Sequence, residues 1–105
     1  MAQFDVHRNV GAQRSVMPYV MVVQSSRFDR ALRRVVIPMV LETAVEATEP
    51  RLNPAFEIEG KRVVLNPLHI VSIALERLGE RVTSLKGDGD RVIAAIDVVI
   101  TRAWD

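Results

Sequence analysis

The sequence contains no cysteine among its 105 residues, and this absence excludes several classes of protein at once. A disulfide framework, a thiolate nucleophile and a cysteine-ligated zinc or iron–sulfur site all require that residue. We therefore expect a fold that is stable in a reducing compartment, and we predict a cytoplasmic protein. Aromatic residues are also scarce, at 5% of the chain, which leaves few side chains on which nucleobases could stack. Direct binding of nucleic acid is therefore disfavoured.

Long apolar runs are absent as well. No stretch approaches the roughly 18 uninterrupted apolar residues that a membrane-spanning helix requires, and residues 1–8 lack the pattern of a secretory signal. The hydrophobic fraction of 49% and the charged fraction of 26% are average for a soluble globular chain. We expect one soluble domain over residues 1–105, with no membrane partner.

Charge is distributed unevenly along the chain, although the net charge is only +1. The first 40 residues have a net charge of +4 and no glutamate or lysine, whereas the remainder has a net charge of −3. The basic half contains Arg8, Arg14, Arg27, Arg30, Arg33 and Arg34. Such a surface attracts acidic partners or nucleic acid; a solvated edge without a partner is the alternative.

Alternating and β-branched segments predict a mainly β protein. Residues 3–7 alternate polar and apolar side chains, and residues 19–23 form a run that we expect to be buried on both faces. Residues 35–37 repeat this pattern, and we expect that strand to stop at Pro38 because proline has no amide donor. Residues 56–59 and 62–65 predict a hairpin around Gly60-Lys61. Residues 70–75 are also β-prone, and residues 39–47 fit either a short helix or an irregular strand.

The last segment predicts a helix. Asp88, Gly89 and Asp90 resemble a helix start, and apolar residues then recur with helical spacing through Ala103. The many β-branched residues of this segment favour a strand by intrinsic propensity. The length of the segment and its capping residues favour a helix, and we give them more weight. Further apolar side chains extend the apolar stripe of this helix beyond one face. This predicts that a second copy of the chain covers the additional apolar surface. The expected homodimer interface comprises Ile93, Ile96, Val98 and Ile100.

The sequence offers no recognisable catalytic centre. His7 and His69 are isolated, without the spacing of a metal site, and no metal or other cofactor is expected. The Gly87-Asp88-Gly89 segment is more typical of a helix start than of a phosphate-binding loop. No set of catalytic residues can be named, so the pattern favours binding, and we expect a protein that is not an enzyme.

Read from end to end, the chain resembles the CcdB family, the toxins of toxin–antitoxin modules. The most specific part is the Arg-Arg-x-Val-Ile-Pro string at residues 33–38. The other marks are Gln3-Phe4-Asp5-Val6, Val23-Gln24-Ser25, Leu78-Gly79-Glu80-Arg81-Val82 with Leu85, and Ala95-Ile96-Asp97. This resemblance implies an SH3-like antiparallel sheet or partial barrel with a small hairpin wing and a C-terminal helix, in a homodimer.

The resemblance also implies a function. Members of the family bind the A subunit of DNA gyrase and trap its complex with cleaved DNA. They are neutralised by a cognate antitoxin whose disordered C-terminal tail wraps the toxin dimer. The positions that correspond to the gyrase-binding residues of the family are Gln3, Phe4, Ser25, Arg27, Asp97, Thr101, Arg102 and Ala103.

The C-terminal end departs from the family pattern. Well-studied members end in Trp-Gly-Ile, and their tryptophan stacks on gyrase, whereas this chain has Thr101-Arg102-Ala103 at those positions. Its one tryptophan, Trp104, comes later. If the helix continues, Trp104 shares a face with Thr101 and replaces the missing contact; a tryptophan folded back on the sheet is the alternative. We therefore include Trp104 among the expected gyrase-binding residues.

Two rival functions remain open from the sequence. A related group of toxins has the same barrel and cleaves RNA, and such an activity would use the segment from Arg27 to Arg34 with His7 or His69 as acid or base. The other alternative is a homologue that dimerises and binds antitoxin but poisons nothing.

Overall fold

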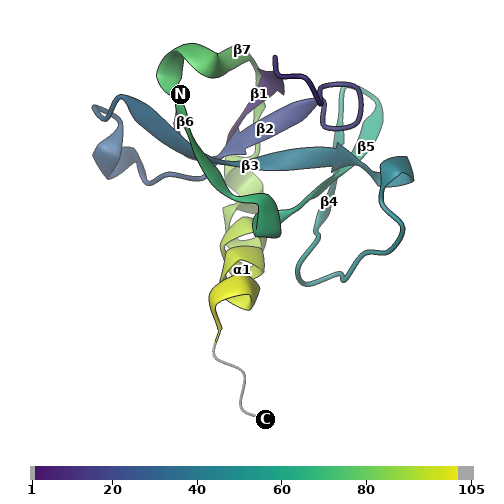
Figure 1. The fold of residues 1–105 in the computed structure, drawn as a ribbon. Helices are drawn as coiled ribbons and strands as arrows, with labels where there is room; N and C mark the ends of the chain where they lie inside the picture. The colour runs from purple at the N-terminus through teal and green to yellow at the C-terminus, as the bar shows by residue number, and fades with distance from the viewer. Residues whose placement is uncertain (1, 102–105) are drawn as a thin grey trace.

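A computed structural model of the chain describes residues 2–101. Seven strands form one antiparallel sheet, and a single α-helix, α1 (Gly89–Ile100), follows them (Figure 1). The strands are β1 (Asp5–Asn9), β2 (Tyr19–Val22), β3 (Arg33–Leu41), β4 (Ala55–Ile58), β5 (Lys61–Leu65), β6 (Val71–Ala74) and β7 (Leu78–Ser84). The mainly β fold with one C-terminal helix is therefore confirmed.

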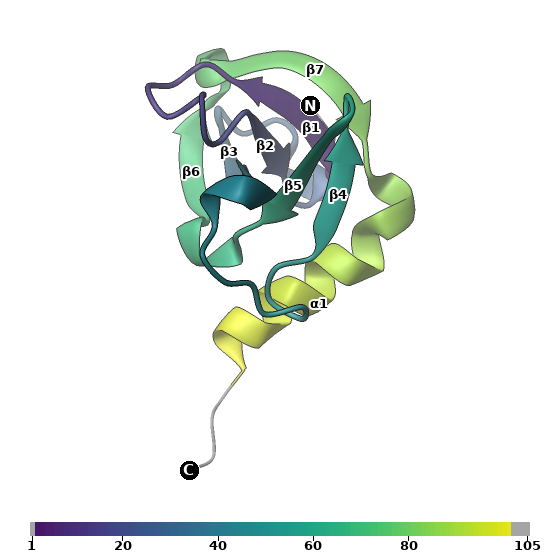
Figure 2. The ribbon, with the colours of Figure 1, turned by 90° about the vertical axis from the view of Figure 1, so that its right-hand side faces the viewer.

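The long strand β3 organises the sheet. The strand order is β4-β5-β3-β2-β1-β7, and β6 pairs with β3 off this path. The first half of β3 pairs with β6 and its last three residues pair with β5, while β2 runs along its other edge. Because β3 carries two neighbours on one edge, the sheet curls into a half-barrel (Figure 2). This half-barrel agrees with the SH3-like sheet that the resemblance implies.

The two faces of the sheet bury two separate cores because side chains alternate along each strand. The larger core contains Tyr19, Met21, Ile37 and Met39, together with the β4–β5 hairpin and Val92 of α1. The smaller core, on the opposite face, contains Val20, Val22 and Val36, with Ile73 and Leu78 packed against it. Burial of β2 on both faces, expected from its continuous apolar run, is confirmed.

The prediction that the third strand stops at Pro38 is wrong, because β3 continues to Leu41. Pro38 pairs with Val20, and its carbonyl accepts a hydrogen bond from the amide of Asn66. The missing amide donor of Pro38 therefore faces the edge of β3 that pairs with β6 and then with β5. The pairing with β6 ends at Val36 and the pairing with β5 begins at Met39, so neither strand pairs with Pro38. A proline is tolerated at this place because no neighbouring strand needs its donor.

Other boundaries differ in smaller ways. The hairpin is confirmed. Its two turn residues are Glu59 and Gly60, which both have positive φ, so the turn lies one residue earlier than the expected Gly60-Lys61. The 39–47 segment combines both alternatives, since the end of β3 leads into a 3₁₀ turn at Glu42–Ala44. Strand β7 was not predicted, because its apolar residues are few and half-buried. The helix is confirmed, but it ends at Ile100 rather than at Ala103.

Candidate functional site

The start of the chain lies beside the first turns of α1. Gln3 donates a hydrogen bond from Nε2 to the carbonyl of Val23 at 3.1 Å, two residues before Ser25. Phe4 is half-buried, packs against the larger core and has positive φ. Its ring fills the space over Gly89, where an added Cβ would come within 2.7 Å of it. Gln3, Phe4 and Ile93 line one shallow hollow.

Beyond this hollow, exposed residues continue along α1 toward the C-terminal end of the helix. Asp97 is exposed and lies one turn beyond Ile93, on the same side of the helix. Thr101 follows one turn later, and its amide donates to the carbonyl of Asp97 at 2.8 Å. The structure therefore connects Gln3, Phe4 and Asp97 along one surface that leads to Thr101.

Ser25 and Arg27 lie in the loop between β2 and β3, at residues 23–32. The Ser25 hydroxyl caps a 3₁₀ turn at Ser26–Phe28 by accepting from the amide of Arg27. The Arg27 guanidinium lies 5.9 Å from the centre of the Phe28 ring, and Phe28 itself is 58% exposed. Gln3 is tied to the start of this loop through the carbonyl of Val23.

Two polar side chains beneath this loop hold it in shape. The Arg34 guanidinium is buried and donates to the backbone carbonyls of Asp29, Ala31 and Arg33. Gln24 donates to the carbonyl of Phe28 and accepts from the amide of Val35. The sequence analysis missed both roles. Arg34 belongs to the Arg-Arg-x-Val-Ile-Pro string, but nothing in the string shows that its charge is turned inward.

The helix presents an apolar outer face. Val92 and Ala95 are fully buried, and Ile96 is partly buried against the larger core. By contrast, the exposed fractions are 42% for Ile93, 40% for Val98 and 70% for Ile100. The helix also contacts the 3₁₀ turn at Pro67–His69, in which Leu68 is exposed. The widened apolar stripe is thus present, with Ile96 turned toward its own core.

Of the gyrase-binding residues expected at the C-terminal end, the structure describes only some. Thr101 is extended, with φ −63° and ψ 137°, and it follows the last helical residue. The helical spacing that would place Thr101 and Trp104 on one face therefore ends before Thr101. Arg102, Ala103 and Trp104 lie outside the described residues.

Neither histidine is placed for acid–base chemistry. His7 is buried, and its Nδ1 bonds to the carbonyl of Gly79 at 2.8 Å. Its Nε2 is enclosed without a partner, out of reach of a large substrate. His69 is exposed, and its Nδ1 lies 3.2 Å from the amide nitrogen of Asn66. Within residues 2–101, no group of three or more His, Asp or Glu side chains could hold a metal ion.

The strongest electrostatic cluster joins the hairpin to the sheet. Arg8 forms a bidentate pair with Glu59, at 2.9 and 2.7 Å, and Tyr19 donates its hydroxyl to the same carboxylate at 2.6 Å. The bonds from Arg8 and Tyr19 lower the pKa of Glu59 to about 2, and burial raises the pKa of Tyr19 to about 12. All three groups satisfy one another, so the cluster stabilises the fold rather than offering a reactive group.

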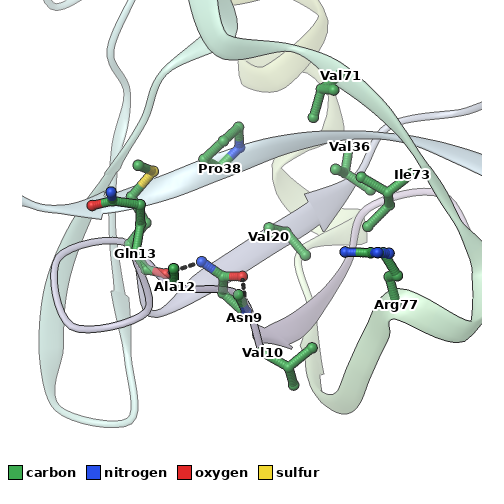
Figure 3. A pocket seen from close by; sticks show the side chains of 12 residues that line it. Asn9, Val10, Ala12, Gln13, Val20, Val36, Pro38, Val71, Ile73 and Arg77 are labelled. Carbon is green, nitrogen blue, oxygen red and sulfur yellow. Dashed lines mark hydrogen bonds between the residues drawn. The ribbon is translucent and has the colours of Figure 1, made fainter.

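A separate groove opens on the sheet face opposite α1 (Figure 3). It has a volume of about 330 Å³ and is lined by Asn9 and the β1–β2 loop on one side and by apolar side chains of β2, β3 and β6 on the other. Among residues 2–101, Arg77, in the turn between β6 and β7, is the one charged residue that lines it. No sequence pattern predicts this groove, because its lining residues come from several separate stretches of the chain.

The structure is similar to a solved structure described as an endoribonuclease in complex with its cognate antitoxin, from mycobacterial species. The TM-score is 0.77 at 13% identity, and the match covers 100% of this chain and 99% of that one. No curated protein sequence matches. The family model for the CcdB protein matches residues 3–101, and the chain belongs to the CcdB family of toxins from toxin–antitoxin modules.

One further finding concerns membranes. Across residues 2–101, no helix is long and apolar enough to span a bilayer.

Proposed function

We propose that this protein is a toxin that binds the A subunit of DNA gyrase and traps the enzyme on cleaved DNA. The observation that carries this proposal is the single surface described above. Gln3 and Phe4 adjoin Ile93 of the helix, which leads to Asp97, and Gln3 is tied to the loop that contains Ser25 and Arg27. The family resemblance assigns gyrase contact to these positions, which come from three separate stretches of the chain.

The surface has the chemistry of a protein-binding site. Arg27 and Phe28 are exposed, and arginine and aromatic residues are frequent in the centres of interfaces. Arg34 and Gln24 fix the loop beforehand, so less conformational entropy is lost when a partner binds. We assign no enzymatic activity to the toxin itself, and we place it in the cytoplasm, where gyrase acts.

Two partners complete the proposal. The exposed apolar side chains Val98 and Ile100 of α1, together with Ile93 at the edge of the proposed gyrase-binding surface, fit a second copy of the chain in a homodimer. An antitoxin neutralises the toxin, and its disordered C-terminal tail folds on binding to the dimer.

A binding titration tests the gyrase contact. Calorimetry with purified gyrase A subunit should give a 1:1 or 2:1 complex for the wild type and at least tenfold weaker binding for a double variant, Arg27→Ala with Asp97→Ala. Arg14→Ala is the matched control, because Arg14 is exposed in the β1–β2 loop, which lines the groove on the sheet face opposite α1. Equal binding by the double variant would contradict the assigned surface, and no binding by the wild type would contradict the target.

A second candidate function is RNA cleavage, which the fold likeness to an endoribonuclease favours. Incubation of the purified dimer with total RNA distinguishes the two functions. We expect intact RNA, because His7 is enclosed and His69 forms no ion pair with a carboxylate of residues 2–101. Cleavage that a His69→Ala variant abolishes would replace the gyrase proposal with the endoribonuclease one.

A further inference from the structure

A further groove lies between α1 and the loop that precedes β4. It has a volume of about 200 Å³, and its lining residues are Pro50, Arg51, Pro54, Arg91, Ala94 and Val98. Figure 2 shows this loop passing beside α1. Ala94 and Val98 are one turn apart, on a different flank of the helix from Ile93 and Asp97, because successive helical residues are about 100° apart. This groove beside α1 is therefore separate from the surface proposed for gyrase.

The loop wall of the groove beside α1 is held in shape before anything binds. The Glu49 carboxylate accepts hydrogen bonds from the amides of Arg51 at 3.2 Å and Leu52 at 3.0 Å. Asn53 donates from its side chain to the carbonyl of Leu65 at 3.0 Å. Little conformational entropy is therefore lost when the groove is filled, which favours binding.

The charge in this groove is positive and unbalanced. Arg51 is exposed, and its guanidinium forms no hydrogen bond or ion pair with any residue from 2 to 101. Arg91 is already held, because it donates to the Asp88 carboxylate at 3.2 Å and to the carbonyl of Ala55 at 3.1 Å. No acidic side chain of the described residues lines the groove. A carboxylate beside Arg51 would balance the charge, since a guanidinium can donate two parallel hydrogen bonds to it.

The chain itself continues next to this groove. Val98, in the last turn of α1, lines it, and residues 102–105 follow with the sequence Arg-Ala-Trp-Asp. Counted from Thr101, the three residues to Trp104 can span about 10 Å. The same distance along a helix is about seven residues, which is the way back from Thr101 to Ala94. Trp104 is therefore within reach of the apolar side chains of the groove, and an acidic residue follows it.

We propose that the segment 102–105 docks in the groove beside α1 when no partner is bound, with Trp104 against the proline and valine side chains and Asp105 beside Arg51. An aromatic ring buries a large apolar area on such a surface, and a partner within the same chain has a high effective concentration. The contact is autoinhibitory, because it withholds Trp104 from gyrase. This role in regulation rests on the proposed gyrase-binding function.

Trp104 is the one tryptophan of the chain, so its fluorescence reports the docking directly. Acrylamide should quench this fluorescence about twofold more strongly in Arg51→Glu than in the wild type, because the reversed charge repels Asp105 and shifts the equilibrium toward the undocked segment. Asp105→Arg should have the same effect, and the two substitutions together should restore wild-type quenching. Arg14→Glu, exposed in the β1–β2 loop, is the matched control and should leave quenching unchanged.

Two results would overturn the docking. One is equal quenching of the wild type and Arg51→Glu when circular dichroism shows that both are folded. The other is wild-type quenching that rises on dilution, because a segment docked within its own chain does not depend on protein concentration.

Titration with gyrase A subunit tests the autoinhibitory role separately. Arg51→Glu should bind about two- to fivefold more tightly than the wild type, since the docked segment competes with gyrase and an exposed ion pair has about this strength. Equal affinity would overturn autoinhibition. If the wild type does not bind gyrase, the proposed function fails, whereas the quenching experiment still decides whether the segment docks.

Discussion

Tyr19 shows how a single side chain links the sheet to the hairpin. Its ring is fully buried in the larger core, while its hydroxyl emerges at the edge to bind Glu59. Arg8 binds the same carboxylate from β1, and Lys61 lies 5.6 Å from the Tyr19 ring centre. Strands β1, β2 and the hairpin therefore meet at one carboxylate.

Removing the Tyr19 hydroxyl tests this link. Tyr19→Phe keeps the buried ring but loses a hydrogen bond to a charged acceptor, so the free energy of unfolding should fall by about 1–2 kcal/mol. Urea denaturation gives this value. In a Glu59→Ala background the same substitution should cost much less, and an equal cost in both backgrounds would show that the hydroxyl does not act through Glu59.

The low pKa of Glu59 predicts an acid-dependent loss of stability. Its pKa is lowered from 4.5 to about 2 in the folded state by the Arg8 and Tyr19 hydrogen bonds. Its contribution is therefore complete above pH 4.5 and is lost as the pH falls from 4.5 toward 2. Unfolding free energies measured across this window should fall less steeply for Glu59→Gln than for the wild type. Glu57→Gln, in the same hairpin, serves as the control and should keep the wild-type slope.

At the scale of the elements, the join between β1 and β7 depends on a glycine. An added Cβ at Gly79 would lie 2.5 Å from the carbonyl oxygen of Arg8 and 2.9 Å from Val10 Cγ1. Such contacts cannot exist without moving one strand. The sequence pattern predicted no strand here, yet this close approach is what allows β7 to pair with β1.

Gly79→Ala should therefore destabilise the fold by about 1–3 kcal/mol, the usual cost of forcing extra atoms into a packed site. Gly87→Ala is the matched control, because nothing lies within 4 Å of its added Cβ, and its effect should be within about 0.5 kcal/mol. Thermal melts followed by circular dichroism compare the two. Equal melting temperatures would contradict the close approach of β1 and β7.

Sequence patterns predicted those elements whose signals are local. The run at residues 19–23, the turn at Gly60 and the helix after Asp88 each contain their own periodicity or capping residues, and all three are confirmed. Elements that depend on their neighbours were missed or misplaced. Strand β3 can continue past Pro38 because the pairing with β6 ends before this residue and the pairing with β5 begins after it. This arrangement is visible only in the assembled sheet.

The residues of the candidate site likewise fall into those that the sequence predicted and those that it did not. Gln3, Ser25 and Asp97 were found through a family resemblance, which supplies positions but not their arrangement. The buried Arg34 and the unpaired Arg77 were not found. Both are arginines in a chain rich in arginine, and whether a guanidinium turns inward, outward or into a groove is decided by tertiary contacts.

For the whole molecule, the apolar face of α1 predicts self-association. Ile100 is 70% exposed, so Ile100→Lys should leave the folded chain intact but place a charge in the proposed dimer interface. Light scattering coupled to size exclusion should show a wild-type dimer and a shift of Ile100→Lys toward monomer. Leu32→Lys, at a leucine that is 80% exposed in the β2–β3 loop, should remain dimeric. A monomeric wild type would contradict the proposed dimer.

The surface proposed for gyrase runs from the β2–β3 loop along α1, whereas the groove between the β1–β2 loop and β6 opens on the sheet face opposite α1. Gyrase poisoning can therefore be tested with substitutions on one face of the molecule alone.

The most direct measurement is a DNA cleavage assay with gyrase, supercoiled DNA and ATP. It compares the intact toxin, the toxin with its antitoxin, and a chain truncated after Arg102, which removes Trp104. Linear DNA should appear with the intact, antitoxin-free protein and should be absent from the other two reactions. No linear DNA from a wild-type protein shown to be folded and dimeric would contradict gyrase poisoning.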